Sequence, residues 1–204
     1  MTAPARTGPG LGHVLGTALV CLALLAVGSW LQGWLPGGDD DPAADPHVRR
    51  GAVGDAIDLR TSTVTVDRVQ GTTRVEQYGA ELVSPGLWVV VSYTVVPTEE
   101  NASITFAELE DARGRTWGLV GRNANSCAES PPGLPVHCTA LLEVPADALP
   151  TLRLRLARLS RDVRFDAVAE VDLGLGAEDA EAFAAAPTFA VPAPVLGDGT
   201  EEES

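Results

Sequence analysis

Short runs of alternating apolar and polar residues fill the middle of the chain and predict β-strands. The run from Gly86 to Val96 is the most apolar, and its β-branched and aromatic residues are interrupted by no charge. Its odd-numbered positions are all apolar, whereas its even-numbered positions become more polar from Trp88 to Thr94. Because successive side chains of a strand point to opposite faces, we expect a central strand with one face fully buried and the other partly buried.

Further segments show the same alternation and predict strands packed around the central one. They are residues 56–59, 62–69, 102–106, 109–111, 115–117, 138–144, 152–156 and 165–173. Residues 70–85 contain two glycines and a proline among polar residues, and predict a long hairpin connection. The pattern predicts an all-β protein, an immunoglobulin-like antiparallel β-sandwich of seven or eight strands over residues 52–175.

A separate apolar run covers residues 11–35, and its cleaner part, 14–31, approaches the ~20 residues that span a bilayer. Trp30 and Trp34 lie one helical turn apart at its end, where indole rings favour the membrane interface. Arg6 precedes the run and Asp39–Asp41 follow it, so the positive-inside rule places the later residues outside. We expect a cytoplasmic segment 1–10, one transmembrane helix at 11–35, and a single-pass protein of the cell membrane with its C-terminal domain outside.

A cleaved signal peptide is the alternative. Residues 14–25 would form its apolar region, and Ala26-Val27-Gly28 would be the small-x-small cleavage site, which gives a secreted protein. A lipoprotein signal is disfavoured because Val20, not a small residue, precedes Cys21.

The segments that flank the sandwich are acidic and poor in large apolar residues. Residues 36–51 predict a solvated tether. Residues 176–204 carry acidic residues and no basic one, and predict a largely disordered tail with a short helix at about 177–186.

Charge excludes one class of partner. The chain of 204 residues has 28 acidic residues, all at or beyond Asp39, and 14 basic residues, all of them arginine, which is typical of a GC-rich bacterial genome. An acidic surface repels phosphates, so we expect no nucleic-acid binding and an unfavourable interaction with anionic lipid surfaces.

Cys127 and Cys138 are the two cysteines outside the apolar run, and an exported domain with one such pair is expected to form a disulfide. By the chain-entropy estimate this disulfide increases the free energy of unfolding by about 3 kcal/mol. The loop that it pins, with Asn123, Asn125 and His137, is the candidate binding surface. The alternative is that the bridge only stabilises the fold.

The sequence contains no signature of a catalytic or metal site. Few histidines occur, and no nucleophile elbow, phosphate loop or metalloprotease motif is present. The carboxylate pairs Glu99 with Glu100 and Glu108 with Glu110 lie near strand ends, where a solvated face explains them. We therefore expect no enzyme activity, no cofactor and no metal.

Four segments in combination carry a resemblance to a known group of domains: 53–55 (Val-Gly-Asp), 86–91 (Gly-Leu-Trp-Val-Val-Val), 106–114, and 138–145 ending in Glu-Val-Pro. Together they resemble the telokin-like, immunoglobulin-related domains of unknown function on bacterial lipoproteins and membrane-anchored proteins. The resemblance covers about residues 52–173 and implies an extracytoplasmic β-sandwich without assigned site residues. The chain departs from the group in lacking a lipid-modified cysteine.

These features predict a non-catalytic binding or accessory module of the bacterial cell envelope, with an envelope or membrane protein as its partner. The alternatives are a structural spacer or subunit of a membrane complex, with contacts through residues 11–35, and a hydrolase that uses carboxylates or His137.

Overall fold

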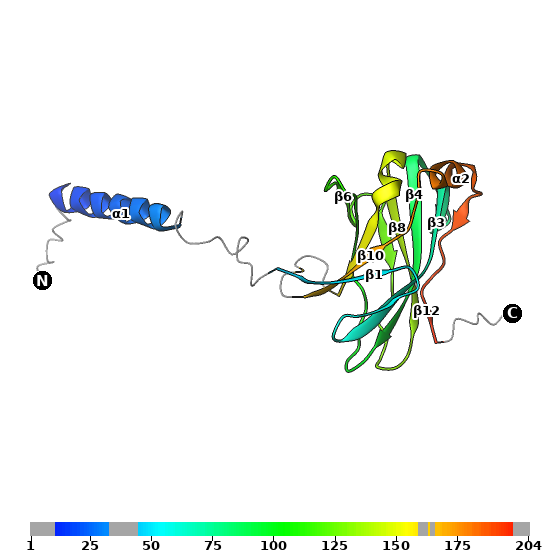
Figure 1. Ribbon diagram of the computed structural model, residues 1–204. Helices are drawn as coiled ribbons and strands as arrows, with labels where there is room; N and C mark the ends of the chain where they lie inside the picture. The colour runs from blue at the N-terminus through cyan, green and yellow to red at the C-terminus, as the bar shows by residue number, and fades with distance from the viewer. Residues whose placement is uncertain (1–10, 33–44, 159–162, 164–165, 198–204) are drawn as a thin grey trace, which may run out of the picture. The chain divides into compact units, whose positions relative to one another are not determined.

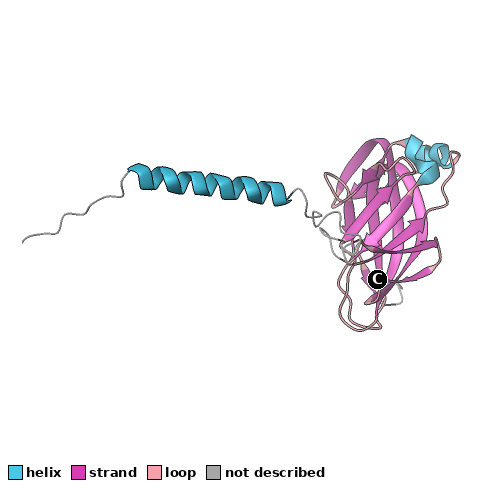
Figure 2. Cartoon of the chain, turned by 60° about the vertical axis from the view of Figure 1, so that its left-hand side comes forward, coloured by secondary structure: helices cyan, strands magenta, loops and turns pink. Residues whose placement is uncertain are grey.

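The computed structural model describes residues 11–32, 45–158, 163 and 166–197. The chain divides into two compact units, residues 1–45 and 46–204. In the first unit, helix α1 (Leu11–Gln32) is formed by the apolar run. In the second unit, two β-sheets pack face to face as a β-sandwich (Figures 1 and 2). The predicted β-sandwich is therefore confirmed.

The larger sheet has seven strands in the order β11-β3-β4-β8-β12, with β2 paired to β3 and β7 paired to β8. The smaller sheet has the order β1-β10-β9-β5-β6. The strands of the larger sheet are β2 (Ala56–Asp58), β3 (Ser62–Gln77), β4 (Ala80–Pro97), β7 (Ala124–Ser126), β8 (Val136–Val144), β11 (Phe189–Ala190) and β12 (Val195–Leu196). Those of the smaller sheet are β1 (His47–Ala52), β5 (Phe106–Glu110), β6 (Thr116–Trp117), β9 (Arg153–Ala157) and β10 (Ala167–Asp172).

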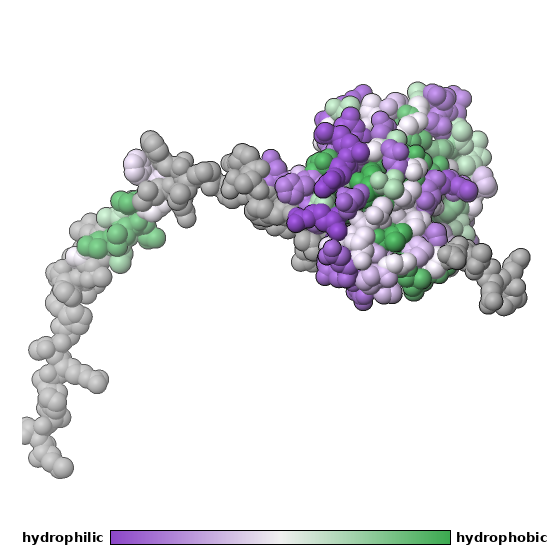
Figure 3. All heavy atoms as spheres, turned by 60° about the horizontal axis from the view of Figure 1, so that its bottom comes forward, coloured by the Kyte–Doolittle hydropathy of each residue, from purple (hydrophilic) through white to green (hydrophobic). Residues whose placement is uncertain are grey.

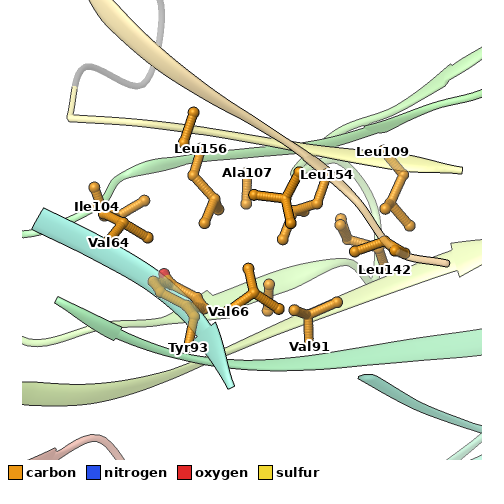
Figure 4. Packing of buried hydrophobic residues seen from close by; sticks show 14 of the residues in the cluster. Val64, Val66, Val91, Tyr93, Ile104, Ala107, Leu109, Leu142, Leu154 and Leu156 are labelled. Atoms are coloured by element: carbon orange, nitrogen blue, oxygen red, sulfur yellow. The ribbon is translucent and has the colours of Figure 1, made fainter. Parts of the chain in front are cut away.

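The predicted central strand lies within β4, which pairs antiparallel with β3 on one side and β8 on the other. Its odd-numbered residues from Leu87 to Val95 are buried between the sheets. Leucines of β9 and β5 meet them from the smaller sheet, as Figure 4 shows for Leu154, Leu156 and Leu109 opposite Val91 and its neighbours. Alternation along both strands thus builds one continuous apolar core.

Residues 70–85, predicted as a long connection, instead belong to strands β3 and β4, whose pairing is irregular between Thr72 and Arg74. β3 and β4 pair as far as Gln77 and Ala80, and only two residues form the turn between them. Tyr78 (φ 52°) and Gly79 (φ 75°) both have positive φ, as a type I′ hairpin turn requires. The expectation that residues 102–106 form a strand was also wrong, because there only Ala102 makes an isolated bridge before β5 begins.

The sandwich differs from the predicted one in two ways: it has more strands than seven or eight, and two of its strand pairs are parallel. The described residues contain twelve strands, and β1 runs parallel to β10 while β11 runs parallel to β3. β1 lies in the segment predicted as a tether. Its side chains are mostly exposed, so its sequence lacks the alternation of apolar and polar residues that predicts a strand. Asp39–Asp41 lie outside the described residues.

In the C-terminal segment the predicted short helix is confirmed, but strands β11 and β12 lie where the sequence predicted a largely disordered tail. Helix α2 (Asp179–Ala185) packs on the end of the sandwich near the 3₁₀ helix η2 (Ala146–Thr151). Residues 187–197, called the C-terminal strap below, then pass from the β3 edge of the larger sheet to the β8 edge (Figure 1). Residues 198–204 lie outside the described part.

The strap covers the outer face of the larger sheet. Phe189 and Val191 pack on Trp88, Val90 and Leu141, which point away from the main core and are nevertheless fully buried. The sequence predicted this face of β4 as partly buried, and the strap supplies the cover. The strap is fixed at its end by the backbone hydrogen bond from Gly197 N to Pro135 O, 2.9 Å long.

Candidate functional site

A groove lies at the end of the sandwich that α2 covers. Its volume is about 680 Å³, within the range of small-molecule and peptide side-chain sites. Both sheets and α2 contribute to its wall, which is mostly apolar. The lining residues are Thr73, Pro85, Gly86, Leu87, Trp117, Glu143, Val144, Pro145, Ala146, Ala180 and Ala184. We call this surface the α2 groove.

The sequence of α2 explains why the groove stays open. Ala180 and Ala184 are one helical turn apart and so share a face, and their methyl groups leave space beside Trp117. Phe183 lies against Gly71 of β3 and holds the helix to the larger sheet. The hydroxyl of Thr72 donates to Pro187 O at 2.9 Å and fixes the chain just after α2.

Two arginines secure the aromatic and acidic side chains around the groove. Arg122 donates to both oxygens of Glu143, at 2.6 and 2.8 Å, and its guanidinium lies 5.2 Å from the ring centroid of Trp88. Arg115 lies 5.3 Å from the ring centroid of Trp117. These contacts neutralise the one carboxylate in the groove wall and fix the indole that forms part of it.

Arg115 is itself held by Asp111, whose side chain is only 2% exposed. Burial acts to raise the pKa of Asp111, but hydrogen bonds from the backbone and side chain of Arg115 and the backbone of Arg113 outweigh it. The pKa of this carboxyl is therefore lower than its ordinary value. The ionised Asp111 thus supports Arg115 and, through it, Trp117.

The α2 groove has few polar side chains in its wall. Among the lining residues, only Thr73 and Glu143 offer side-chain oxygens, and Glu143 is bound by Arg122. A nucleophile with an adjacent base would be needed for covalent catalysis, and the lining residues do not supply one. In the described residues no group of three or more His, Cys, Asp or Glu side chains is arranged to hold a metal ion.

The predicted disulfide between Cys127 and Cys138 is confirmed. It closes the loop between β7 and β8 at its base, next to the pair Ser126 and Thr139. Val144 in the α2 groove lies six positions after Cys138 on β8, which is about 20 Å along a strand. The disulfide and the α2 groove are therefore at opposite ends of β8.

The two predicted binding asparagines make hydrogen bonds within the chain. Asn125 accepts from Tyr93 Oη at 2.6 Å and donates to Ile104 O at 2.7 Å. Asn123 donates to Gly118 O at 2.7 Å and accepts from Glu143 N at 2.9 Å. Their amides are thus committed to the fold, and Asn123 helps to position Glu143 in the α2 groove.

His137 lies at the other end of β8 and does not join the asparagines in one site. Its Nδ1 is 2.9 Å from Thr94 Oγ1, and its Nε2 is 3.1 Å from Gly197 O. The ring therefore links β4 to the end of the C-terminal strap.

Three of the four carboxylates in the predicted pairs form ion pairs with arginines. Glu108 and Glu110 both face Arg155, at 3.3 and 3.5 Å, and Glu100 pairs with Arg158. Burial raises the pKa of Glu108, Arg155 opposes this effect, and Glu110 adds to it. Neither pair lines the α2 groove.

For the predicted membrane segment, the structure shows Trp30 exposed near the end of α1, while Trp34 lies outside the described residues. Among the described helices, none combines the length and the apolar character needed to cross a bilayer.

Sequence reasoning missed the α2 groove. Trp117 was predicted only as the end of a strand over residues 115–117, and α2 as a short helix without a role. The sequence signal that could have revealed it is the spacing of Ala180 and Ala184 around Phe183. In a helix this spacing places one large side chain for packing beside a face of small side chains.

No protein-family model matches the chain, and no curated protein matches it. Two solved structures are similar to it. The yjhA protein from Bacillus subtilis is 15% identical, with a TM-score of 0.44, and the similarity covers 59% of this chain and 99% of that one. An uncharacterised β-sandwich protein from Clostridium difficile 630 is 8% identical, with a TM-score of 0.42, and the similarity covers 63% of this chain and 95% of that one.

Proposed function

We propose that the chain is a non-catalytic binding module of the bacterial cell envelope, and that its α2 groove receives an apolar side chain from a partner envelope protein. The groove carries this proposal, because it is an apolar hollow of about 680 Å³ whose wall includes a fixed indole. Aromatic residues in such positions dominate binding energy at protein interfaces. The finer assignment to telokin-like, immunoglobulin-related domains belongs to the same proposal and rests on the sequence segments described above.

Export from the cytoplasm is supported by the disulfide, since such bonds form and persist in oxidising compartments. Attachment to the membrane is supported by the apolar sequence of residues 11–35. Secretion after cleavage is the alternative, and the small-x-small sequence Ala26-Val27-Gly28 supports it. Fractionation of cells distinguishes the two: an attached protein stays with membranes after a carbonate wash, and a secreted one appears in the medium without its first residues.

Photo-crosslinking in intact cells tests the groove. A photoreactive phenylalanine replaces Ala184, which lines the α2 groove, or Ala182, which is exposed on the same helix and does not line it. We expect a discrete adduct from position 184 and none from position 182. The adduct should weaken when Trp117 is changed to Ala, with the fold verified by circular dichroism. Equal labelling from positions 182 and 184, or no adduct from either, would contradict the proposal.

A further inference from the structure

A second hollow, distant in sequence from the α2 groove, lies at the open edge of the sandwich beside β1. Its volume is about 730 Å³, and Pro46, His47, Val48, Arg49 and Arg60 line it. The cationic groups come from two places, since His47 and Arg49 belong to β1 while Arg60 follows β2 of the larger sheet. Figure 3 shows hydrophilic residues gathered on the side of the domain where β1 lies in Figure 1.

The register of β1 explains why these side chains face the space between the sheets. His47 pairs with Ala167 and Arg49 with Ala169 of β10, and both alanines are buried in the main core. Directly paired residues project from the same face of a sheet. His47 and Arg49 therefore occupy positions on the core side of an edge strand, where they remain exposed.

Arg60 is held in an uncommon backbone conformation. Its φ is +73°, in the left-handed region that non-glycine residues rarely adopt. Asp58 Oδ1 accepts from Arg60 N at 2.7 Å, and Thr98 Oγ1 donates to Arg60 O at 3.3 Å. The surrounding bonds maintain this conformation, and such conformations concentrate at ligand sites.

The two arginines of this hollow form no ion pairs with carboxylates, unlike most other arginines in the described part of the chain. Of the eleven arginines in the described ranges, eight form ion pairs with carboxylates. Within the same ranges, Arg49, Arg60 and Arg68 form none. Asp55 and Asp58 line the adjoining hollow together with Arg49, and each accepts a hydrogen bond from a backbone N–H. In so acidic a chain, two unpaired arginines beside one histidine are an exception.

We propose that His47, Arg49 and Arg60 form a binding site for a phosphate group, either free or in a lipid headgroup. Guanidinium groups bind phosphate through paired, charge-assisted hydrogen bonds. The site modifies the expectation that anionic lipid surfaces repel this chain, because it offers local positive charge on an acidic domain. It is independent of the α2 groove.

A different account is that the charges only protect the edge of β1 from pairing with another sheet, as charged side chains on edge strands do. The two accounts differ in one respect. Edge protection needs charge but no ligand, whereas the proposed site must bind phosphate in a saturable manner.

Nuclear magnetic resonance of the arginine Nε–H groups tests the proposal on the full chain in a maltoside detergent. Inorganic phosphate is titrated in one arm and a short-chain phosphatidylglycerol in the other, with chloride keeping the ionic strength constant. We expect saturable shifts of the Arg49 and Arg60 signals, and binding weaker by about tenfold or more in Arg49→Gln and Arg60→Gln. Arg68→Gln is the matched control, since Arg68 is also unpaired and lies outside the hollow.

Saturation by both ligands supports a site for the phosphate group itself, and saturation by the lipid alone assigns the site to a headgroup. Absence of saturable shifts with either ligand overturns the proposal, as does an equal response of the Arg68 signal. A double variant of Arg49 and Arg60 that self-associates, in a chain that binds no phosphate, assigns the charges to edge protection and also overturns it.

Discussion

The ring of Phe183 lies directly against the backbone of Gly71 and joins α2 to β3. A β-carbon at residue 71 would lie 2.0 Å from Cδ2 of the ring. Glycine is therefore required there for α2 to lie flat on the end of the larger sheet. The α2 groove depends on this contact, because Ala180 and Ala184 form part of its wall.

Replacing Gly71 with Ala should displace α2 and lower the free energy of unfolding by about 1–3 kcal/mol, the usual effect of an added methyl group in a packed region. Chemical denaturation measures the loss, and hydrogen exchange should be faster in α2. Gly118→Ala is the control, since its β-carbon would approach Glu108 Oε2 no closer than 3.5 Å. If the ring is the cause, Phe183→Ala should reduce the effect of the Gly71 change. Equal losses for the two glycine variants would contradict this interpretation.

Removing the disulfide by changing Cys127 and Cys138 to Ala should lower the free energy of unfolding by about 3 kcal/mol, because the unfolded chain regains the freedom of the closed loop. Denaturation curves with and without a reducing agent measure the effect. Cys21→Ser provides the comparison, since Cys21 is a free cysteine in α1. A reducing agent that left the wild-type curve unchanged would contradict the prediction, provided that thiol labelling showed complete reduction.

Asp111 should make the fold sensitive to acid. Its pKa is lower in the folded chain than its ordinary value of 3.8, so ionised Asp111 stabilises the fold fully above that pH. This stabilisation is lost as the pH falls through the lowered pKa. Asp111→Asn should be less stable than the wild type at neutral pH, and the difference should shrink below pH 3.8. Unfolding curves at several pH values check it, and a difference that stays constant with pH would contradict it.

Glu108 should act in the opposite direction and in another pH range. Burial raises its pKa above the ordinary value of 4.5, an effect that Arg155 opposes and Glu110 increases. The folded chain therefore takes up a proton before the unfolded chain does, and stability gains as the pH falls through the raised pKa towards 4.5. Glu108→Gln should lack this gain. Parallel stability curves for the variant and the wild type across this range would show that Glu108 does not contribute.

Ending the chain after Ala186 removes the C-terminal strap and should expose Trp88, Val90 and Leu141. We expect a loss of about 2 kcal/mol, since Phe189 and Val191 are only partly buried, together with binding of an apolar dye or self-association. A chain that ends after Gly197 is the control, because it keeps the whole strap. Equal stability and equal dye binding of the two shortened chains would contradict a covering role.

Alternation of residue types was sufficient to predict the core strands. In β9 and the second half of β4 the period of two is clear, as expected for strands with one face buried between two sheets. The hairpin between β3 and β4 was predicted with too long a connection, because Tyr78 occupies a position where Asn or Gly usually signals a two-residue turn. β1 was missed because it is short, exposed and arginine-rich, and the strap because its alanines and prolines are typical of disordered chain.

The two proposed sites could not be predicted from the sequence, because their residues come together only in the fold. The α2 groove is formed by residues such as Leu87, Trp117 and Ala184, which are far apart in sequence and carry no shared motif. The hollow at β1 joins Arg49 and Arg60 across two sheets, and only the pairing of β1 with β10 shows that Arg49 faces inward. Neither of these two arrangements of residues follows from local secondary-structure propensity. The disulfide was predictable because two cysteines outside the apolar run leave one combination.

The pairing of β1 with β10 also determines the order in which the domain is completed. His47 and its partner Ala167 are 120 residues apart, so the first strand to be synthesised waits for almost the last one. The smaller sheet can therefore gain its edge strand β1 only after residues 167–172 have been made.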